Sequence, residues 1–244
     1  MIPSHSHATS DYWVVVPAAG AGKRMGANTP KQYLPIDGKP LIAHTLENIL
    51  SWPGLKGVVV AISADDEVFA TLECAQDDKI QTVIGGAERA DSVLAALEYL
   101  SQHQSPTTSV LVHDAARPLV STDDIHKLLS AAPMALLAQP ASDTVKLAGA
   151  ESCVRQTLPR EQIWLAQTPQ KAPLGTLLQA LQRGLDENPK AITDEASALE
   201  LAGHAPELVA ACRSNFKITH PSDLVLAEAL LRHRSGGASS GNNL

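Results

Sequence analysis

The stretch from Tyr12 to Lys31 constrains the fold of this chain more than any other. It opens with an apolar run, Tyr-Trp-Val-Val-Val, and changes after Pro17 to small residues, Ala-Ala-Gly-Ala-Gly. A β-branched run suits a strand buried on both faces, whereas the small residues leave the following backbone uncovered. Bare N–H groups in a glycine-rich turn can converge on an anion. The stretch therefore predicts a buried strand followed by a phosphate-binding loop.

Cations follow these glycines closely. Lys23, Arg24 and Lys31 supply more positive charge than a structural turn requires, and a polyphosphate carries the complementary charge. The alternative is an ordinary strand-to-helix turn whose basic side chains face water. The spacing of the cations favours a nucleotide site.

Two better-known glycine loops do not match. A Walker A loop needs a Gly where Pro17 stands and a Ser or Thr where Arg24 stands. The dinucleotide fingerprint needs a third Gly where Met25 stands, and Asp37 lies in a turn instead of at the end of a second strand. A dehydrogenase is therefore disfavoured.

Composition narrows the class of protein. The chain has 244 residues, with 26 acidic against 19 basic and a formal net charge of -7, which argues against general nucleic-acid binding. Its three cysteines lie far apart, so we expect a reducing compartment, the cytoplasm. We expect no membrane span and no secretory signal, because no apolar run is long enough. Residues 235–244 are expected to form a disordered tail.

The hydrophobic pattern alternates between strands and helices. We therefore expect an α/β fold, a doubly wound and mostly parallel Rossmann-like sheet, in a single domain over residues 1–234. The expected strands are 12–16, 57–62, 80–84, 109–112, 134–139, 163–166, 207–211 and 215–219. The expected helices are 40–50, 65–73, one from Val93, one from Thr122, 173–185, one from Thr193 and 221–231.

Two further loops follow expected strands. One is Gly85-Gly86-Ala87-Glu88-Arg89-Ala90-Asp91-Ser92, and the other is His113-Asp114-Ala115-Ala116-Arg117-Pro118. Loops at the carboxyl ends of parallel strands share one crevice, so both should lie beside the first loop. The alternatives are that Glu88 and Asp91 only complement a helix N-terminus, that Asp114 and Arg117 form a surface pair, and that His113 is structural.

The alternation breaks at residues 142–157, which look like a β-hairpin with two polar faces around Gly149. An isolated hairpin is marginally stable. We therefore expect this arm to pack on another surface, and a homodimer is the simplest symmetric arrangement.

These segments together resemble the 2-C-methyl-D-erythritol 4-phosphate cytidylyltransferases of the nonmevalonate isoprenoid pathway. The resemblance rests on Pro-Ala-Ala-Gly-x-Gly-x-Arg-Met, Pro-Lys-Gln-Tyr, Gly-Gly-x-Glu-Arg-x-x-Ser-Val, Val-His-Asp-Ala-Ala-Arg-Pro, Thr-Pro-Gln and Thr-Asp-Glu-Ala-Ser. It implies transfer of CMP from CTP to the polyol phosphate, with release of pyrophosphate. It also implies magnesium held mainly by the triphosphate, with no certain protein ligand.

The resemblance implies roles for particular residues. Arg24 and Lys31 would stabilise the transition state, and Arg160 and Lys217 would hold the acceptor phosphate for attack. The nucleotide would lie against Pro17, Ala18, Ala19, Gly20, Gly22, Gly86, Ala87 and Ser92. The acceptor region would include Asp114, Ala115, Arg117, Thr144, Thr168 and Thr193.

Some of these assignments have simpler alternatives. The local pattern favours Thr193 as the N-cap of a helix, and Lys217 could simply face water. Ala87 departs from the family pattern, because relatives can carry a polar side chain at this position. Base recognition in this chain would then rest on backbone groups and Ser92. By the same resemblance the hairpin arm is a dimer contact, and Thr144 and Arg160 at its base would serve the neighbouring subunit's site.

Two other functions remain open on the sequence. A CTP enzyme acting on ribitol 5-phosphate would share the nucleotide loops and differ at the acceptor. A non-catalytic nucleotide-binding regulator would keep the glycines but could lose Arg24, Lys31 or Lys217, and all three are present.

Overall fold

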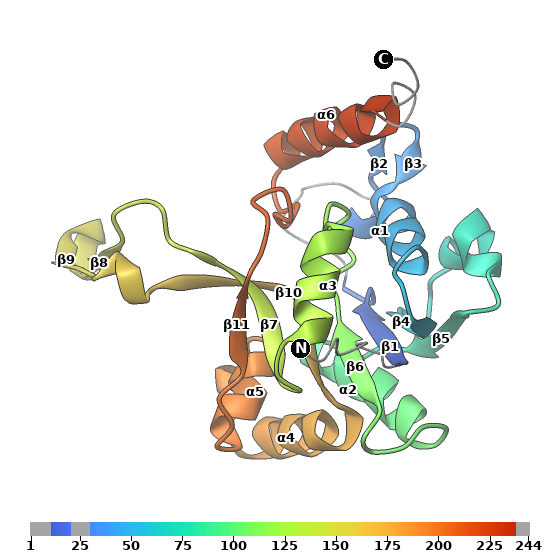
Figure 1. Cartoon of the computed structure of the whole chain (residues 1–244), viewed down its shortest axis with the longest axis horizontal. Coiled ribbons are helices and arrows are strands. Elements are labelled where there is room, and N and C mark those ends of the chain that lie inside the picture. The colour runs from blue at the N-terminus through green and yellow to red at the C-terminus, as the bar shows by residue number, and fades with distance from the viewer. Residues whose placement is uncertain (1–10, 21–29, 238–244) are drawn as a thin grey trace, which may run out of the picture.

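A seven-stranded sheet forms the centre of the protein, as seen in a computed structural model that describes residues 11–20 and 30–237 (Figure 1). In spatial order its strands are β11 (Glu207–Ala210), β7 (Ala135–Pro140), β10 (Trp164–Pro173), β6 (Ser109–Val112), β1 (Tyr12–Pro17), β4 (Leu55–Ile62) and β5 (Ile80–Ile84). Only β10 runs antiparallel to its neighbours within this described sheet. The expected doubly wound, mostly parallel α/β fold is confirmed.

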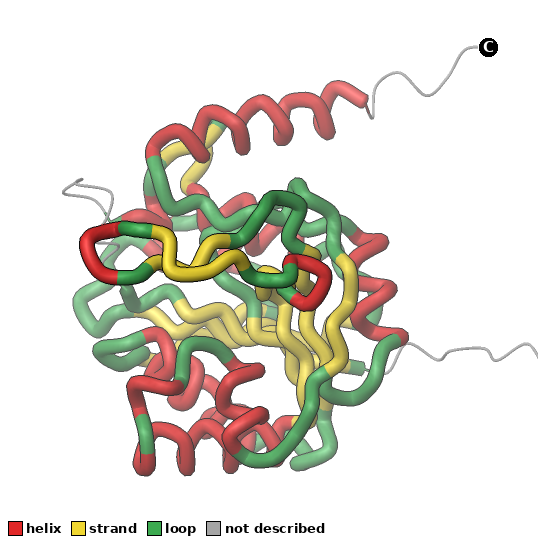
Figure 2. Tube along the Cα trace, turned by 90° about the vertical axis from the view of Figure 1, so that its left-hand side faces the viewer, coloured by secondary structure: helices red, strands yellow, loops and turns green. Residues whose placement is uncertain are grey.

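Helices cover both faces of the sheet (Figure 2). On one face lie α1 (Leu41–Leu50) and α3 (Thr122–Ser130), and on the other lie α2 (Arg89–Ser101), α4 (Leu174–Glu187) and α5 (Glu195–Leu201). The closing helix α6 (Pro221–Gly237) packs beside the small ribbon of β2 (Pro35–Ile36) and β3 (Lys39–Pro40). No helix in the described ranges is long and apolar enough to cross a membrane.

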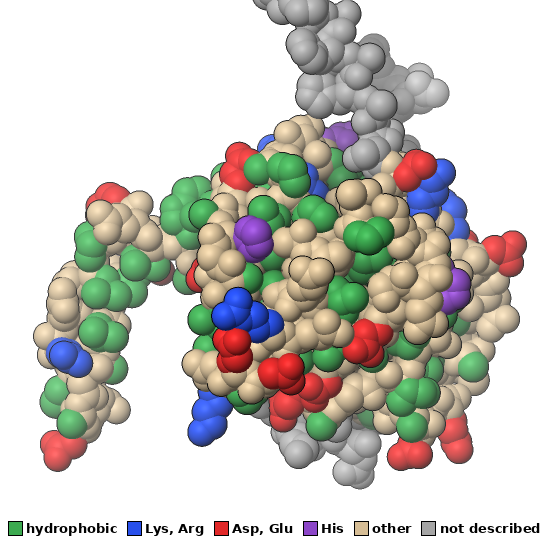
Figure 3. Space-filling model, turned by 90° about the horizontal axis from the view of Figure 1, so that it is seen from below, with side chains coloured by type: hydrophobic (Ala, Val, Ile, Leu, Met, Phe, Trp, Pro, Cys, Tyr) green, Lys and Arg blue, Asp and Glu red, His purple; other side chains and the backbone are tan. Residues whose placement is uncertain are grey.

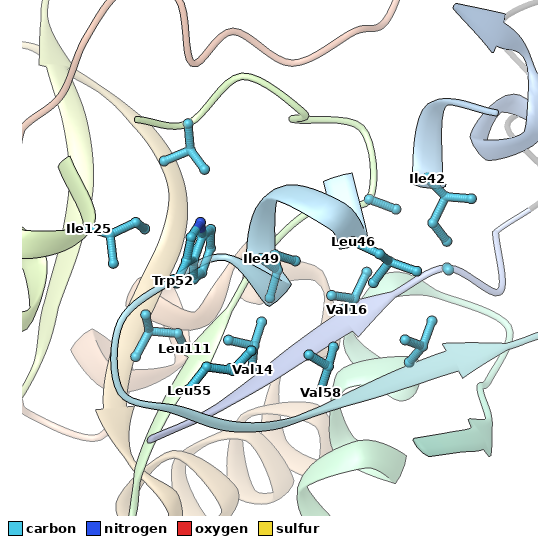
Figure 4. Close-up of a cluster of buried hydrophobic side chains, with 14 of the residues drawn as sticks. Val14, Val16, Ile42, Leu46, Ile49, Trp52, Leu55, Val58, Leu111 and Ile125 are labelled. Atoms are coloured by element: carbon cyan, nitrogen blue, oxygen red, sulfur yellow. The ribbon is translucent and has the colours of Figure 1, made fainter. Parts of the chain in front are cut away.

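The valine run of β1 explains why both faces must be covered. Successive side chains of a strand point to opposite faces. Val14 and Val16 enter the core beneath α1, beside Leu46 and Ile49 (Figure 4), whereas Val15 enters the core formed with α2 and α4. All three valines are fully buried. β1 therefore holds the centre of the sheet and fixes where its glycine loop begins.

A hairpin arm leaves the body between β7 and β10. Its two strands, β8 (Lys146–Ala148) and β9 (Val154–Thr157), pair only with each other among the described strands. Figure 3 shows the arm standing away from the body with hydrophobic side chains along it. The hairpin is confirmed, but its surface is not wholly polar, because Leu147 is 40% and Val154 64% exposed.

Two expected elements are wrong. In place of a helix over 65–73 there are two 3-10 turns, Phe69–Thr71 and Glu73–Gln76. The Asp66 carboxylate accepts from the backbone N–H groups of Val68 and Phe69, a local bond that competes with helix formation. Residues 215–219 form no strand, because their backbone bonds to the loop after β6 instead, as in Ile218 N–H to Ala116 O at 2.9 Å.

Several boundaries also differ from the sequence interpretation. β10 continues through 167–170 to Pro173, and α2 begins at Arg89, which places Ser92 in its first turn. The backbone of α6 continues through 235–237, part of the expected tail. Asp194, not Thr193, is the N-cap of α5, and its carboxylate accepts from Ser197 N–H.

Candidate active site

The first two glycine loops touch each other at the carboxyl edge of the sheet. A Cβ added to Gly85 would lie 2.6 Å from Ala19 Cβ and 2.7 Å from Ser92 Oγ. Gly86 N–H donates to Ser92 Oγ at 3.2 Å, so the second loop closes on its own helix. The expected common crevice is confirmed, and it depends on the missing side chain of Gly85.

A pocket opens where these loops meet the end of β6. β1 lies between β4 and β6, so the strand order reverses its direction at β1. Open α/β sheets bind ligands at such a switch point. The described residues that line the pocket are Pro17, Ala18, Ala19, Gly20, Lys31, Gln32, Arg89, Ser92, Asp114, Ala115, Ala116 and Lys217.

A buried carboxylate, Asp114, forms the charged floor of this pocket. Its Oδ1 accepts from Arg89 Nε at 2.9 Å, and its Oδ2 lies 2.8 Å from Lys217 Nζ and 3.6 Å from Arg117 Nε. Burial raises the pKa of Asp114, but the charges of Arg89, Lys217 and Arg117 outweigh burial and hold this pKa far below its ordinary value. Asp114 is therefore ionised throughout the physiological range.

Arg89 is shared between two carboxylates. Its two terminal nitrogens donate to the Glu195 carboxylate at 2.7 and 3.1 Å, while its Nε serves Asp114. Burial lowers the pKa of Arg89, but the charges of Glu195 and Asp114 more than compensate and raise it. Arg89, at the N-terminus of α2, thus links Glu195 at the N-terminus of α5 to Asp114 after β6.

Neutral groups fix the backbone of Asp114 from below. Thr168 Oγ1 accepts from Asp114 N–H and bonds to His113 Nδ1, both at 3.0 Å, and His113 Nε2 lies 3.0 Å from Arg117 O. Burial lowers the pKa of His113 to about 4, and its ring packs edge-on against Trp52. His113 is therefore a neutral structural group, as its simpler interpretation held.

The loop at 215–219 is bound to the same corner. Arg117 Nη1 donates to Asn215 O at 2.6 Å, and the Asn215 side-chain amide donates to Thr168 O at 2.9 Å. Lys31 Nζ donates to Ile218 O at 2.9 Å. These bonds bring Lys31 and Lys217 to the pocket from positions 186 residues apart (217 − 31).

Residues 12–233 match the family model of 2-C-methyl-D-erythritol 4-phosphate cytidylyltransferase. The chain belongs to this family. A relative of that name from Vibrio vulnificus is 49% identical over 221 residues, which cover 89% of this chain and 93% of the relative. One from Pseudomonas entomophila is 50% identical over 218 residues, covering 87% and 92%.

Solved structures of the family have the same fold. The crystal structure of the Francisella tularensis 2-C-methyl-D-erythritol 4-phosphate cytidylyltransferase is 37% identical, with a TM-score of 0.78, covering 90% of this chain and 99% of that one. The Thermus thermophilus enzyme is 31% identical, with a TM-score of 0.74 and coverage of 91% and 99%. The chain is therefore a nucleotidyltransferase of the cytidylyltransferase kind.

The residues expected for such a cytidylyltransferase differ in where they lie relative to the pocket. Those lining the pocket are Pro17, Ala18, Ala19, Gly20, Lys31, Ser92, Asp114, Ala115 and Lys217. Those next to it but not lining it are Gly86 and Ala87 in the second loop, and Arg117 and Thr168, which are buried beneath Asp114. Gly22 and Arg24 lie outside the described residues.

The remaining three expected residues lie in an adjoining groove or at the base of the arm. Thr193 lines an adjoining groove that shares Arg89 and Lys217 with it. Thr144 and Arg160 lie exposed near the base of the arm, where Arg160 Nη1 donates to Ser142 O at 3.0 Å. Within one chain, the arm residues are therefore separate from the pocket.

Sequence reasoning missed the pairing of Arg89 with Glu195. Both residues stand in quoted motifs, but by local pattern Glu195 is only an acid in the first turn of a helix, which suits the helix dipole. The two are 106 positions apart, so no local pattern links them. The available signal was an Arg and a Glu in the first turns of two helices that follow the same sheet edge.

The described residues do not form a metal site. No group of three His, Cys, Asp or Glu side chains among them could hold a metal ion. Asp114, the carboxylate among the described lining residues, already contacts Arg89 through Oδ1 and Lys217 through Oδ2. A protein-held magnesium ion does not fit this donor set.

Proposed function

We propose that this pocket transfers CMP from CTP to 2-C-methyl-D-erythritol 4-phosphate, giving 4-diphosphocytidyl-2-C-methyl-D-erythritol and pyrophosphate. The observation that carries the proposal is the meeting of Lys31, Lys217 and the ionised Asp114 at the switch point, between two glycine loops in contact. The family of the chain supplies the reaction, and the pocket supplies the charges that it needs.

The nucleotide would lie along the two glycine loops. We assign the triphosphate to Pro17–Gly20 together with Gly22 and Arg24, and the cytosine to Gly86, Ala87 and Ser92. The support is chemical: a glycine-rich turn can direct backbone N–H groups at an anion, and the second loop offers backbone groups to a flat base. Ser92 Oγ is engaged with Gly86 N–H, which keeps this part of the second loop in one conformation.

The reaction needs charge stabilisation more than proton transfer. An acceptor phosphate oxygen attacks the α-phosphorus in line, a new P–O bond forms, and the bond from the α-phosphorus to the bridging oxygen breaks as pyrophosphate leaves. We assign Lys31 and Arg24 to the charge that develops on the phosphates and Lys217 to the acceptor phosphate. The neutral His113 beneath the floor is not needed as a base, because the attacking oxygen is already ionised.

We further propose that magnesium, when bound, is held mainly by the triphosphate and neutralises part of its charge. The pairing of both Asp114 oxygens with cations supports this assignment over a protein-bound ion. The acceptor would be bordered by Asp114, Ala115 and Thr193, with Arg117 and Thr168 holding that border in place.

The arm suggests how Thr144 and Arg160 could take part. We propose a homodimer in which the arm, with its exposed Leu147 and Val154, packs on a second copy and presents Thr144 and Arg160 to the neighbouring pocket. Residues 1–234 would form one catalytic domain. The unpaired state of Cys74, Cys153 and Cys212 supports a reducing, cytoplasmic setting.

Pyrophosphate release tests the proposed reaction directly. The purified chain is given CTP with 2-C-methyl-D-erythritol 4-phosphate or ribitol 5-phosphate, and ATP, GTP and UTP replace CTP in parallel reactions. We expect rapid release only with CTP and the methylerythritol phosphate. Preference for ribitol 5-phosphate would reassign the acceptor, and binding of CTP without release would favour a regulator.

A further inference from the structure

Four charged side chains of alternating sign form a row, of which the last three line the pocket: Glu195, Arg89, Asp114 and Lys217. Arg89 contacts Glu195 at 2.7 Å and Asp114 at 2.9 Å, and Asp114 contacts Lys217 at 2.8 Å. The two carboxylates are buried, with Glu195 2% and Asp114 8% exposed, whereas the Arg89 side chain is 28% and the Lys217 side chain 38% exposed. The row therefore begins in the protein interior and ends on an ammonium group in the pocket.

The members of the row come from four separate segments. Glu195 begins α5, Arg89 begins α2, Asp114 follows β6, and Lys217 lies in the loop before α6. A guanidinium donates in a rigid planar fork, so an Arg that holds two carboxylates also fixes the angle between them. Arg89 thus determines where the Asp114 carboxylate lies relative to α5.

We propose that Arg89 and Glu195 are positioning residues for cytidylyl transfer, which hold the Asp114 carboxylate and, through it, the Lys217 ammonium. This inference rests on the proposed function for the reaction that it serves. Arg89 lines the pocket, but its three nitrogens donate to Asp114 and Glu195, so we assign its effect to the position of Asp114 and not to contact with the phosphates.

The charge of Glu195 is essential to this arrangement. The Glu195 carboxylate binds both terminal nitrogens of Arg89, so that Arg89 contacts Asp114 only through Nε and Oδ1. Asp114 Oδ2 is therefore left to contact Lys217 Nζ. If Gln replaced Glu195, the shape would persist but the guanidinium charge would act on Asp114 alone. Arg89 would then compete with Lys217 for the carboxylate, and the ammonium would be held less firmly.

A double-mutant cycle tests the coupling. Glu195→Gln and Arg89→Lys are each made in the wild-type chain and in a Lys217→Ala chain, and single-turnover rates are measured with enzyme in excess. We expect each change to slow the wild-type rate by about ten- to a hundredfold, the usual cost of a charged hydrogen bond. In the Lys217→Ala chain the same changes should cost less than about twofold, because the group they position is gone.

Other outcomes of this cycle would overturn the proposal. Equal losses in both chains would mean a general structural role, and no loss in the wild-type chain would mean no role. Arg89→Lys keeps the positive charge and provides the test if Glu195→Gln does not fold. The matched control is Glu187→Gln, which breaks the exposed Arg183–Glu187 pair of α4 and should leave the rate unchanged.

A second measurement needs no substrate. The rate at which an amine-acylating reagent modifies Lys217 is followed by mass spectrometry, with the surface pair Lys39–Glu47 as internal reference. An ammonium held at 2.8 Å against Asp114 is less accessible to the reagent than a released one, so Glu195→Gln should make Lys217 react faster relative to Lys39. An unchanged ratio would overturn the positioning role even if the wild-type chain released no pyrophosphate, whereas absent release alone would count only against the proposed reaction.

Discussion

Gly85→Ala tests whether the contact between the two glycine loops forms the nucleotide site. The added Cβ would lie 2.6 Å from Ala19 Cβ, whereas carbon atoms in contact prefer about 3.5–4.0 Å. The two loops must therefore separate by about 1 Å. They cannot do so freely, because Gly85 N–H is bonded to Ile62 O at 2.8 Å and Ser92 Oγ closes the other side at 2.7 Å.

Both a stability and a rate effect follow from this displacement. Overpacking a tight site costs about 1–3 kcal/mol of unfolding free energy. A 1 Å misplacement of positioning groups can cost about a hundredfold in rate. We therefore expect the free energy of unfolding in urea to fall by about 1–3 kcal/mol. We expect kcat/KM for CTP to fall by about a hundredfold.

A matched glycine lies on the hairpin arm. A Cβ added to Gly149 would meet Arg155 Cβ at 3.4 Å, an ordinary contact, so Gly149→Ala should change neither quantity. Urea unfolding and pyrophosphate release are measured on both variants. Wild-type kinetics with CTP in Gly85→Ala would refute the view that close approach of these loops shapes the nucleotide site.

Further predictions concern charge, pH and assembly. Lys31→Ala should lower turnover about 100-fold or more, as expected for an electrostatic donor, and a near wild-type kcat would remove Lys31 from the mechanism. The pKa of His113 lies at about 4 in the folded chain, below its ordinary 6.5, so the unfolded chain binds the extra proton between these values. As the pH is lowered from about 6.5 to 4, the unfolding free energy should therefore fall by about 1.4 kcal/mol per pH unit, a loss that His113→Gln lacks, and parallel urea profiles would contradict this. Deleting residues 142–157 should yield monomers on size-exclusion chromatography, and an unchanged dimer would exclude the arm as the main contact.

The alternation of strands and helices was predictable because it depends on local pattern. The valine run of β1 identified a central strand, and the loops after three parallel strands identified the pocket. Such predictions succeed because the carboxyl ends of parallel strands lie at one edge, whatever their spatial order.

Segments whose structure depends on distant partners were not predictable. Residues 215–219 have the apolar alternation of a strand, yet Ile218 N–H donates to Ala116 O and the segment joins no sheet. The row from Glu195 to Lys217 likewise exists only after four segments meet. In both cases the decisive partner lies about a hundred residues away in sequence.

The reversed direction of β10 has a consequence for how this enzyme can vary. A parallel strand after β7 would need a crossover covering a face of the sheet. Because β10 runs antiparallel to β7, the connection between them starts and ends at the same edge of the sheet. The arm therefore does not have to cross either face of the sheet. Its length and tip can therefore be exchanged between relatives while the core stays the same. If the arm is the proposed dimer contact, grafting another arm at Ala141 and Leu158 would alter the choice of partner subunit and leave the nucleotide pocket unaltered.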